Sequence, residues 1–246
     1  MKQAHIMLDD SLNIKYAILP GDPGRIDRIA AHLDDVKELE YNREFKSISG
    51  TYAGTEILAI STGIGGCSAG IAVEELNNIG IKAAIRIGSC GALSQDISLG
   101  DLIIASGAVR DDGPSKAYLP EIYPAYADIS LCAALIRMAE SMKLRYHEGV
   151  ILSHESFYHE ENDTESEYWS GKGLLGADME SAALFTIGRL RGIKCASVLN
   201  NVVLYGQDTG EAIGGYAQGE NLTAMGEANE IELALRTFSY IDSMPL

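Results

Sequence analysis

The segment that most constrains the fold of this chain is the apolar run from Ala83 to Ile87, which contains Arg86 and is followed by the sequence Gly-Ser-Cys-Gly. Apolar and β-branched residues that end in glycines are typical of a buried parallel strand, so we expect a strand whose carboxyl end opens into a turn of small residues. The backbone of such a turn can approach a ligand closely. The run therefore predicts a buried strand with a ligand site at its end.

Arg86 is the residue of this strand that needs an explanation. Burying a guanidinium without a partner is prohibitively costly, so Arg86 must meet an opposite charge. Either an internal carboxylate forms a structural ion pair with it, or an anion from outside the chain binds it. The strand alone leaves both hypotheses open.

A second candidate anion site follows an apolar strand that we expect from Ile14 to Leu19. Asp22 suits a helix N-cap and the proline after it suits the first helical position, so a helix is expected over Ile26 to Leu33. The N–H groups around Gly21 would lie beside the positive end of that helix, with Arg25 on its first turn, and could bind an anion. An ordinary capped helix with a solvated arginine explains the same residues.

Strands and helices alternate along the whole chain, so we expect a single α/β domain over residues 1–246 with a sheet covered by helices on both faces. The stretch from Val36 to Ile48 alternates as an exposed strand does. With a turn over Ser49 to Thr55 and a returning strand from Ile57 to Ser61, it predicts a hairpin.

Composition limits the partners and the compartment. The net charge of −16 would repel nucleic acid and anionic membrane surfaces, whereas a local cluster of arginines can still hold a small anion at short range. The four cysteines lack the spacing of a zinc or redox motif, which indicates reduced thiols. No signal peptide and no apolar run of membrane-spanning length is present, so we expect a cytoplasmic protein.

Five short blocks together carry a more specific signal. They are Gly21-Asp22-Pro23-Gly24-Arg25, Asn42-Arg43-Glu44-Phe45, Ser61-Thr62-Gly63-Ile64-Gly65, Arg86-Ile87-Gly88-Ser89-Cys90-Gly91 and Asp178-Met179-Glu180-Ser181. In this order the chain resembles the nucleoside phosphorylase family, which includes uridine phosphorylases and hexameric purine nucleoside phosphorylases, over nearly its whole length. The segment from Ser61 to Leu76 is closest to the uridine phosphorylase signature, although Cys67 stands where proline or alanine is usual. The resemblance implies a central mixed, twisted and partly barrel-like β-sheet flanked by helices.

The resemblance also implies a reaction, the reversible phosphorolysis of a nucleoside by a pentosyltransferase. Inorganic phosphate, the co-substrate, attacks C1′ and the base leaves, so that no redox or metal cofactor is required. By resemblance, Gly21, Arg25, Arg86 and Ser89 hold the phosphate, and Arg43 reaches in from a neighbouring subunit. Forked guanidinium donors match phosphate oxygens in a way that lysine cannot reproduce.

The ribose residues follow from the same resemblance. Glu180 would accept hydrogen bonds from the 2′ and 3′ hydroxyls, Met179 would pack on the sugar, and Asp178 stands at a ribose-site position where the family usually has glutamate. Arg86 and Glu180 would be the catalytic residues. His5 of the neighbouring subunit would bind the 5′ hydroxyl, although a disordered terminal residue is the simpler interpretation of His5 alone.

Sharing His5 and Arg43 across an interface implies a homo-oligomer, either a dimer with shared sites or the family's hexameric trimer of dimers. Glu44, Ile64 and Ser68 match positions that bind a monovalent cation, such as potassium, between subunits in some uridine phosphorylases. A salt bridge or simple hydrogen bonds would explain Glu44 and Ser68 equally well.

The base is the part of the substrate on which the sequence departs from both branches of the family. Phe157 and Tyr158 should wall the base or sugar pocket, but Glu161 lies in the segment from His159 to Asp163 where uridine phosphorylases carry a glutamine and an arginine. The segment from Asn200 to Leu204 lacks the aspartate with which purine enzymes protonate the leaving base, and Asp208 comes a few residues later. Without that acid, a purine leaving group loses on the order of 10²- to 10⁴-fold in rate.

The apolar last strand favours uridine or deoxyuridine as the nucleoside. Three alternatives remain: a purine nucleoside phosphorylase, a nucleosidase that uses water, and a non-catalytic nucleoside-binding protein. Arg25 and Arg86 argue against the nucleosidase, because a water nucleophile needs no such clamp.

Overall fold

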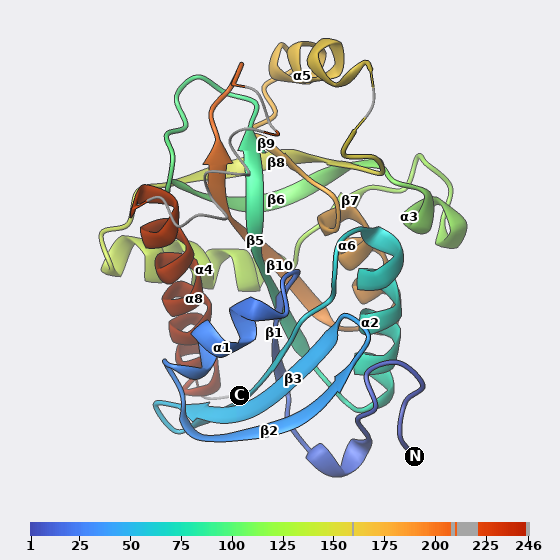
Figure 1. Cartoon of the computed structure of the whole chain (residues 1–246), viewed down its shortest axis with the longest axis vertical. Helices are drawn as coiled ribbons and strands as arrows, with labels where there is room; N and C mark the ends of the chain where they lie inside the picture. The colour runs from blue at the N-terminus through green and yellow to red at the C-terminus, as the bar shows by residue number, and fades with distance from the viewer. Residues whose placement is uncertain (159, 208–209, 211–220, 245–246) are drawn as a thin grey trace.

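The computed structural model describes residues 1–158, 160–207, 210 and 221–244. A mixed ten-stranded β-sheet runs through its centre (Figure 1). Along the sheet, the strands are β10 (Lys194–Val203), β6 (Leu102–Asp111), β8 (Tyr146–His154), β9 (Gly176–Asp178), β5 (Ala83–Ala92), β1 (Tyr16–Pro20), β4 (Thr55–Ile60), β3 (Phe45–Tyr52) and β2 (Asp34–Asn42), with β7 (Ala125–Tyr126) paired to β6.

One part of the sheet closes on itself. Strand β5 pairs with β9 and also with β10, so β5, β9, β8, β6 and β10 form a closed ring. Strands β1, β4, β3 and β2 extend from β5 as an open arm. The neighbours β4, β1, β5 and β10 are parallel, whereas β10 and β6 are antiparallel, so the sheet is mixed and partly barrel-like, as predicted.

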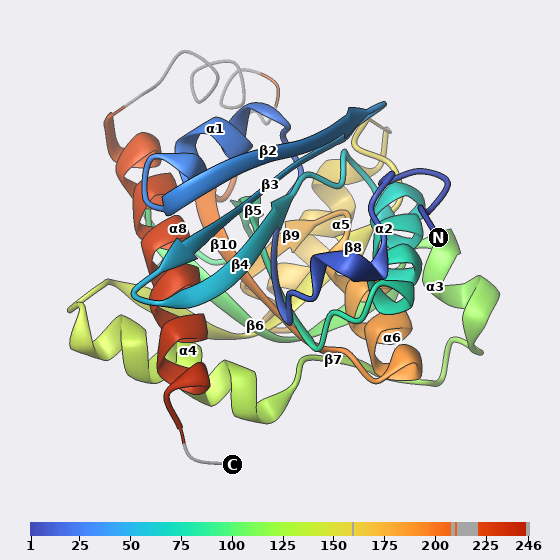
Figure 2. The same ribbon diagram turned by 90° about the horizontal axis from the view of Figure 1, so that it is seen from below.

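Helices cover the sheet on two sides. In both ribbon views, α1 (Gly24–Ala30), α4 (Ile129–Ser141) and α8 (Asn221–Asp242) lie on one side, and α2 (Gly66–Asn78), α3 (Gly113–Tyr118) and α6 (Ser181–Arg191) lie on the other (Figure 2). Helix α5 (Asn162–Ser170) lies beyond the ends of β8 and β9, and a short 3₁₀ helix (Asp10–Leu12) precedes β1. Within the part of the chain that the structure describes, no helix is long and apolar enough to cross a membrane.

The core forms where the central strands are apolar on both faces. Six consecutive residues of β5, from Ala83 to Gly88, are buried, as parallel strands between two helical layers require. Helix α6 is buried over its first eight residues, Ser181 to Gly188, because α2 and α3 pack on its outer side. These two elements fix the positions of Arg86 and of the residues just before α6.

The turn that we expected after Ile87 is wrong, because β5 continues to Ala92. Ser89 and Cys90 pair with Asn200 and Asn201 of β10, so the ladder passes through the glycines. Gly88 serves another purpose: a Cβ atom there would lie 2.7 Å from Arg86 Nη2. The glycine makes room for the arginine side chain rather than for a turn.

The hairpin expected between Val36 and Ser61 is also wrong, because the chain forms three antiparallel strands there. It reverses first at Arg43, whose φ of +55° ends β2, and again at Ala53 and Gly54, both at positive φ. Ser49 to Tyr52 therefore belong to β3, not to a turn. The first reversal places Arg43 at the exposed tip between β2 and β3.

Candidate active site

Arg86 is the centre of a buried charge cluster at the carboxyl ends of the parallel strands. Its side chain is 6% exposed; Nε donates to Asp178 Oδ2 at 3.0 Å, and Nη2 donates to Glu180 Oε2. The buried Nη1 has no hydrogen-bond partner among the residues that the structure describes. It faces Gly21, where a Cβ atom would lie 4.0 Å away. Internal carboxylates therefore hold one edge of the guanidinium and leave the Nη1 donors available.

The carboxylate of Asp178 accepts several hydrogen bonds. Asp178 ends β9, beside Ser153 of β8, three residues before the first residue of α6. Ser153 Oγ donates to its Oδ1 at 2.9 Å, while Ser181 Oγ (2.6 Å) and the Ser181 N–H (3.1 Å) donate to its Oδ2. The carboxylate thus satisfies the first turn of α6 and orients Arg86 at the same time.

Glu180, just before α6, contacts both Gly65 before α2 and Arg86 of β5. Its side chain is 6% exposed, and Oε1 accepts the N–H of Gly65 at 2.5 Å. Gly65 has a φ of +93° and precedes α2, so the carboxylate meets the positive end of that helix. Burial raises the pKa of Glu180, although the charge of Arg86 opposes the rise. Met179 lies half-buried beside it.

The turn after β1 brings Gly21 against this cluster. The Gly63 N–H donates to Gly21 O at 3.0 Å, and a Cβ atom on Gly21 would lie 3.1 Å from Gly63 O. Asp22 Oδ1 accepts the N–H of Gly24, the first residue of α1, at 2.7 Å, and the helix begins two residues before the expected Ile26.

Arg25 on α1 points inward and is only 3% exposed, so the hypothesis of a solvated arginine is wrong. Its Nε donates to Glu227 Oε2 at 2.9 Å, and its Nη1 lies 3.2 Å from Glu230 Oε1. Ser89, half-buried in β5, lies opposite Asn200 of β10. Gly21, Arg25, Arg86 and Ser89 therefore gather at one end of the sheet.

His5 and Arg43 lie apart from this cluster: no hydrogen bond or ion pair in the described part of the chain joins either to Arg86 or Glu180. They share another surface, since Asn42 Nδ2, next to Arg43, donates to His5 O at 2.8 Å. His5 is not a loose terminal residue, because Glu75 Oε1 lies 2.7 Å from its Nδ1 and Glu75 Oε2 accepts its N–H at 3.0 Å. The imidazole is anchored through Nδ1, so Nε2 takes no part in the contact with Glu75.

Known proteins are similar to this chain in sequence and in fold. A family model described as the Phosphorylase superfamily matches residues 15–203. The chain belongs to this superfamily. A guanosine phosphorylase of Halorubrum lacusprofundi is 40% identical over 197 residues, covering 80% of this chain and 81% of the relative. A uridine phosphorylase of Treponema pallidum is 38% identical over 205 residues, covering 79% and 80%.

The superfamily fold is confirmed at the level of the whole chain by a solved structure. The crystal structure of uridine phosphorylase from Vibrio fischeri ES114 matches with a TM-score of 0.90 and 45% sequence identity, covering 97% of this chain and 98% of that one. A mixed, partly barrel-like sheet with flanking helices is therefore the architecture of this superfamily member.

The three residues of the predicted cation site lie close together in the chain's surface layer. Ser68 Oγ donates to Glu44 Oε1, which lowers the pKa of Glu44. A Cβ atom on Gly63, at a φ of +70°, would lie 2.7 Å from Glu44 Cγ, so only glycine fits beside this carboxylate. Ile64 follows and is 80% exposed. A carboxylate, a hydroxyl and a backbone carbonyl are thus available as hard oxygen ligands.

The candidate base residues lie on the loop before α5. The rings of Phe157 and Tyr158 meet edge to face at 4.7 Å, and Tyr158 is 82% exposed. Asn162 Nδ2 donates to Phe157 O at 2.7 Å and so closes the loop around Glu161, which is exposed. His159 and Asp208, two residues on which the base prediction touched, lie outside the described residues.

The segment expected to lack the purine acid, Asn200 to Leu204, begins with a buried amide. Asn200 is 0% exposed, and its Nδ2 donates to Thr223 O of α8 at 2.8 Å. A Cβ atom on Gly226 would lie 2.0 Å from Asn200 Oδ1, so the amide fills the space between β10 and α8. Asn200 therefore links β10 to α8.

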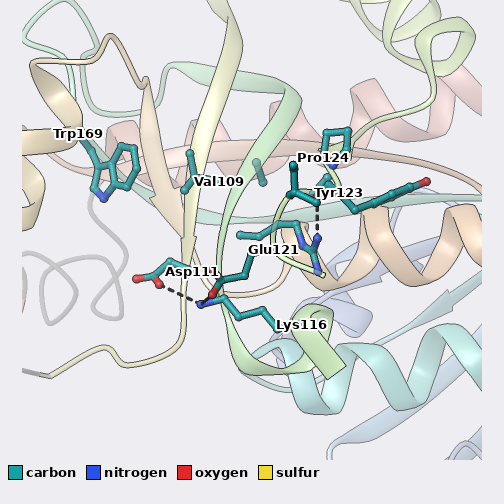
Figure 3. Close-up of a pocket in the computed structure, with 11 residues that line it drawn as sticks. Val109, Asp111, Lys116, Glu121, Tyr123, Pro124 and Trp169 are labelled. Atoms are coloured by element: carbon teal, nitrogen blue, oxygen red, sulfur yellow. Dashed lines mark hydrogen bonds and ion pairs between the residues drawn. The ribbon is translucent and has the colours of Figure 1, made fainter. Parts of the chain in front are cut away.

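Two surface hollows lie outside the Arg86 cluster. The larger, of about 390 Å³ (Figure 3), is lined by Arg110, Lys116, Tyr123 and Trp169 among others, and includes none of the predicted site residues. Its polar groups are already paired, since Arg110 Nη1 donates to Tyr123 O at 2.6 Å and Lys116 contacts Asp111. A smaller hollow, of about 240 Å³, includes His5 among its lining residues.

Sequence reasoning missed the acids that hold the predicted site residues. They are Glu75 for His5 and Glu227 and Glu230 for Arg25. A signal was present: Glu227 and Glu230 are three residues apart on α8, on the same side as the inward-facing Ile231 and Leu235. Acids on an apolar helix face indicate buried partners.

Proposed function

We propose that the chain is a nucleoside phosphorylase that acts on uridine or 2′-deoxyuridine, in a nucleoside salvage role. Its superfamily and its relatives make it a pentosyltransferase of this class. The observation that carries the proposal is the guanidinium of Arg86. Asp178 and Glu180 hold two of its nitrogens, while the buried Nη1 faces Gly21 without a hydrogen-bond partner among the described residues. A phosphate oxygen suits that donor.

The reaction needs one bond made and one broken. A phosphate oxygen bonds to C1′, and the C1′–N bond breaks with its electron pair passing to the base. Arg86, Arg25 and Ser89, with the Gly21 backbone, would hold the phosphate, and Arg43 of a neighbouring subunit would complete the clamp. Fixing the anion against the sugar carbon supplies orientation, and no cofactor chemistry is needed for this step.

Glu180 would act on the sugar side. As C1′ becomes cationic, a fixed carboxylate near the ribose hydroxyls stabilises the developing charge, and burial strengthens the effect. Met179 would pack on the sugar ring. Asp178 would act on the ribose site mainly by orienting Arg86. Its oxygens already accept hydrogen bonds from Ser153, Ser181 and Arg86.

Uridine or deoxyuridine is preferred over purines because of Asn200. This residue stands in the segment where purine enzymes carry their acid, and its amide is bonded to α8. Phe157, Tyr158 and Glu161 would line the base. A purine substrate is the second candidate, since the chain is 40% identical to a guanosine phosphorylase.

The first prediction is that uridine is consumed only when phosphate is present. Ultraviolet absorbance would follow uridine, deoxyuridine, inosine and guanosine in parallel, with and without phosphate. Turnover of uridine without phosphate would point to a nucleosidase instead. Faster turnover of guanosine would identify a purine enzyme, and no turnover of any nucleoside would leave a binding protein.

We propose a homodimer with shared sites as the smallest active unit, and a hexamer of three such dimers as the assembly. His5 and Arg43 support this, because they lie on one surface, held by Glu75 and Asn42, away from the Arg86 cluster of their own chain. His5 Nε2 would then reach the 5′ hydroxyl in the partner's site.

The second prediction tests this sharing by complementation. In a mixed dimer of Arg43→Ala and Glu180→Gln subunits, one site carries both defects and the other is intact, so co-expression should restore about a quarter of wild-type activity. His5→Ala mixed with Arg43→Ala is the control, because every site then keeps one defect and activity should stay low. No recovery with the first pair would contradict a shared site.

A monovalent cation such as potassium is proposed at Glu44, Ile64 and Ser68. The lowered pKa of Glu44 keeps that carboxylate charged at neutral pH. The three residues together offer oxygen atoms that could bind a cation. Such a cation would hold the two subunits together near His5 rather than take part in the bond exchange.

We also propose that the protein works in the cytoplasm. All four cysteines are free thiols in the structure, and three of them, Cys90, Cys132 and Cys195, are buried. Unpaired thiols suit a reducing compartment.

A further inference from the structure

Glu230 is a buried carboxyl that the reaction described above does not use. Its side chain, on α8, is 0% exposed. Oε2 accepts the N–H of Gly88 in β5 at 3.1 Å, and Oε1 lies 3.2 Å from Arg25 Nη1 in α1. Glu227, one turn earlier on α8, accepts from Arg25 Nε at 2.9 Å and also pairs with Arg28. Helix α8 therefore fixes Arg25 against the strand that carries Arg86.

The carboxylates around the proposed phosphate site outnumber the guanidinium groups. The cluster contains Arg25, Arg28 and Arg86, with Arg43 added from the neighbouring subunit in the proposed assembly, against Asp22, Asp178, Glu180, Glu227 and Glu230. A phosphate dianion bound to Arg25 and Arg86 adds two more negative charges where water screens them poorly. Neutralising one buried carboxyl would therefore strengthen binding of the anion.

We propose that Glu230 carries this proton, as a positioning residue that holds Arg25 and the Gly88 N–H, and that phosphate binds tightly only while Glu230 is neutral. The inference rests on the proposed phosphate site. When Glu230 loses its proton to solvent, its contact with Arg25 Nη1 becomes a full ion pair, and the added negative charge repels the anion. Only an O–H bond is made or broken in this step.

The surroundings of Glu230 favour this assignment over the other acids. Asp178 accepts from Arg86 and from two serines, and Glu227 lies between two arginines. The titratable groups that face Glu230 are Arg25 from α1, Arg86 and Cys90 from β5, and Glu227 from its own helix.

The charge state of Glu230 follows from its burial. Burial raises the pKa of Glu230 to about 8, because the charges of Arg25 and Arg86 and the Gly88 N–H offset the loss of water only in part, and Glu227 adds to the rise. Burial also raises the pKa of Glu180, but Arg86 bonds to that carboxylate directly. The neutral form of Glu230 is therefore present near pH 7 and is lost as the pH rises through about 8.

Sulfate binding to the full-length protein tests the proposal, because sulfate stays a dianion where phosphate itself titrates. For the wild type, calorimetry should give a Kd that rises about tenfold per pH unit above about pH 8, whereas the Kd of Glu230→Gln should stay flat. Glu232→Gln is the matched control, since this carboxylate lies two residues along α8 and bonds to Tyr52 and Arg236 instead. It should keep the wild-type pH dependence.

Equal pH dependence in the wild type and Glu230→Gln, or a flat wild-type curve, would overturn the proposal. If Glu230→Gln does not fold, a second measurement on the wild-type protein alone still tests the proposal. Heats of sulfate binding at about pH 8.5 in buffers of different ionisation enthalpy report proton uptake, which should be about three-quarters of a proton per sulfate, whereas zero uptake overturns the proposal. Phosphate-dependent uridine turnover without proton linkage would defeat this inference alone, while absent turnover would defeat the proposed function.

Discussion

Arg86→Lys is expected to lower kcat/KM for phosphate by roughly 10²- to 10³-fold. The variant keeps a positive charge beside Asp178 and Glu180, but a single ammonium cannot donate to both carboxylates and also present a third nitrogen beside Gly21. The loss should fall mainly on the KM for phosphate. Initial rates at saturating uridine and varied phosphate would measure it.

Lysine is the informative substitution at this position. Arg86→Ala would leave two buried carboxylates without a counter-charge, a change that typically costs about 3–5 kcal/mol of stability. A loss of activity could then come from unfolding as well as from lost phosphate binding. Arg110→Lys provides the matched control, because Arg110 is 8% exposed and donates to Ser115 and to backbone carbonyls beside the larger hollow. It should lower the melting temperature and leave the phosphate KM unchanged. If Arg86→Lys behaves like this control, Arg86 is a structural ion pair only.

The main charged residues of the site could be predicted from the sequence, because charged residues within apolar segments have few other roles in a protein core. An arginine within an apolar strand demands a counter-charge, and the structure supplies it as Asp178 and Glu180, two acids from one of the five blocks. The alternation of strands and helices likewise predicts the covered sheet. What the sequence could not show is which of the two hypotheses for Arg86 holds, since the guanidinium meets carboxylates and still presents Nη1.

The errors have local physical causes. Gly88 suggests a turn in the sequence. In the structure the strand is continuous, and the Arg86 side chain occupies the space that a Cβ atom on Gly88 would need. Arg43 reverses the chain at positive φ, a conformation that favours glycine or asparagine, so nothing in its residue type marked the turn. Glu230 stands 142 residues from its partner Gly88 and 205 from Arg25, and such distant pairing is set only by the packing of α8 on the sheet.

Glu180→Gln is expected to reduce kcat by about 10³-fold while leaving the phosphate KM equal or lower, the reverse of the split expected for Arg86→Lys. The amide can still accept the Gly65 N–H, but it no longer neutralises Arg86 or stabilises a cationic sugar. Phosphate then meets a more positive Arg86, so binding is kept while the chemical step slows. Saturation kinetics in both substrates would separate the two effects.

Asp101→Asn is the control for Glu180→Gln, because Asp101 is another buried carboxylate, 6% exposed, that pairs with Arg145 and His147 away from the cluster. It should change stability and not kcat. A rise in the phosphate KM with kcat unchanged in Glu180→Gln would mean that Glu180 only holds Arg86. A fall in kcat that is larger for uridine than for 2′-deoxyuridine would instead place the carboxylate on the 2′ hydroxyl, because the deoxy sugar lacks the group that Glu180 would accept from.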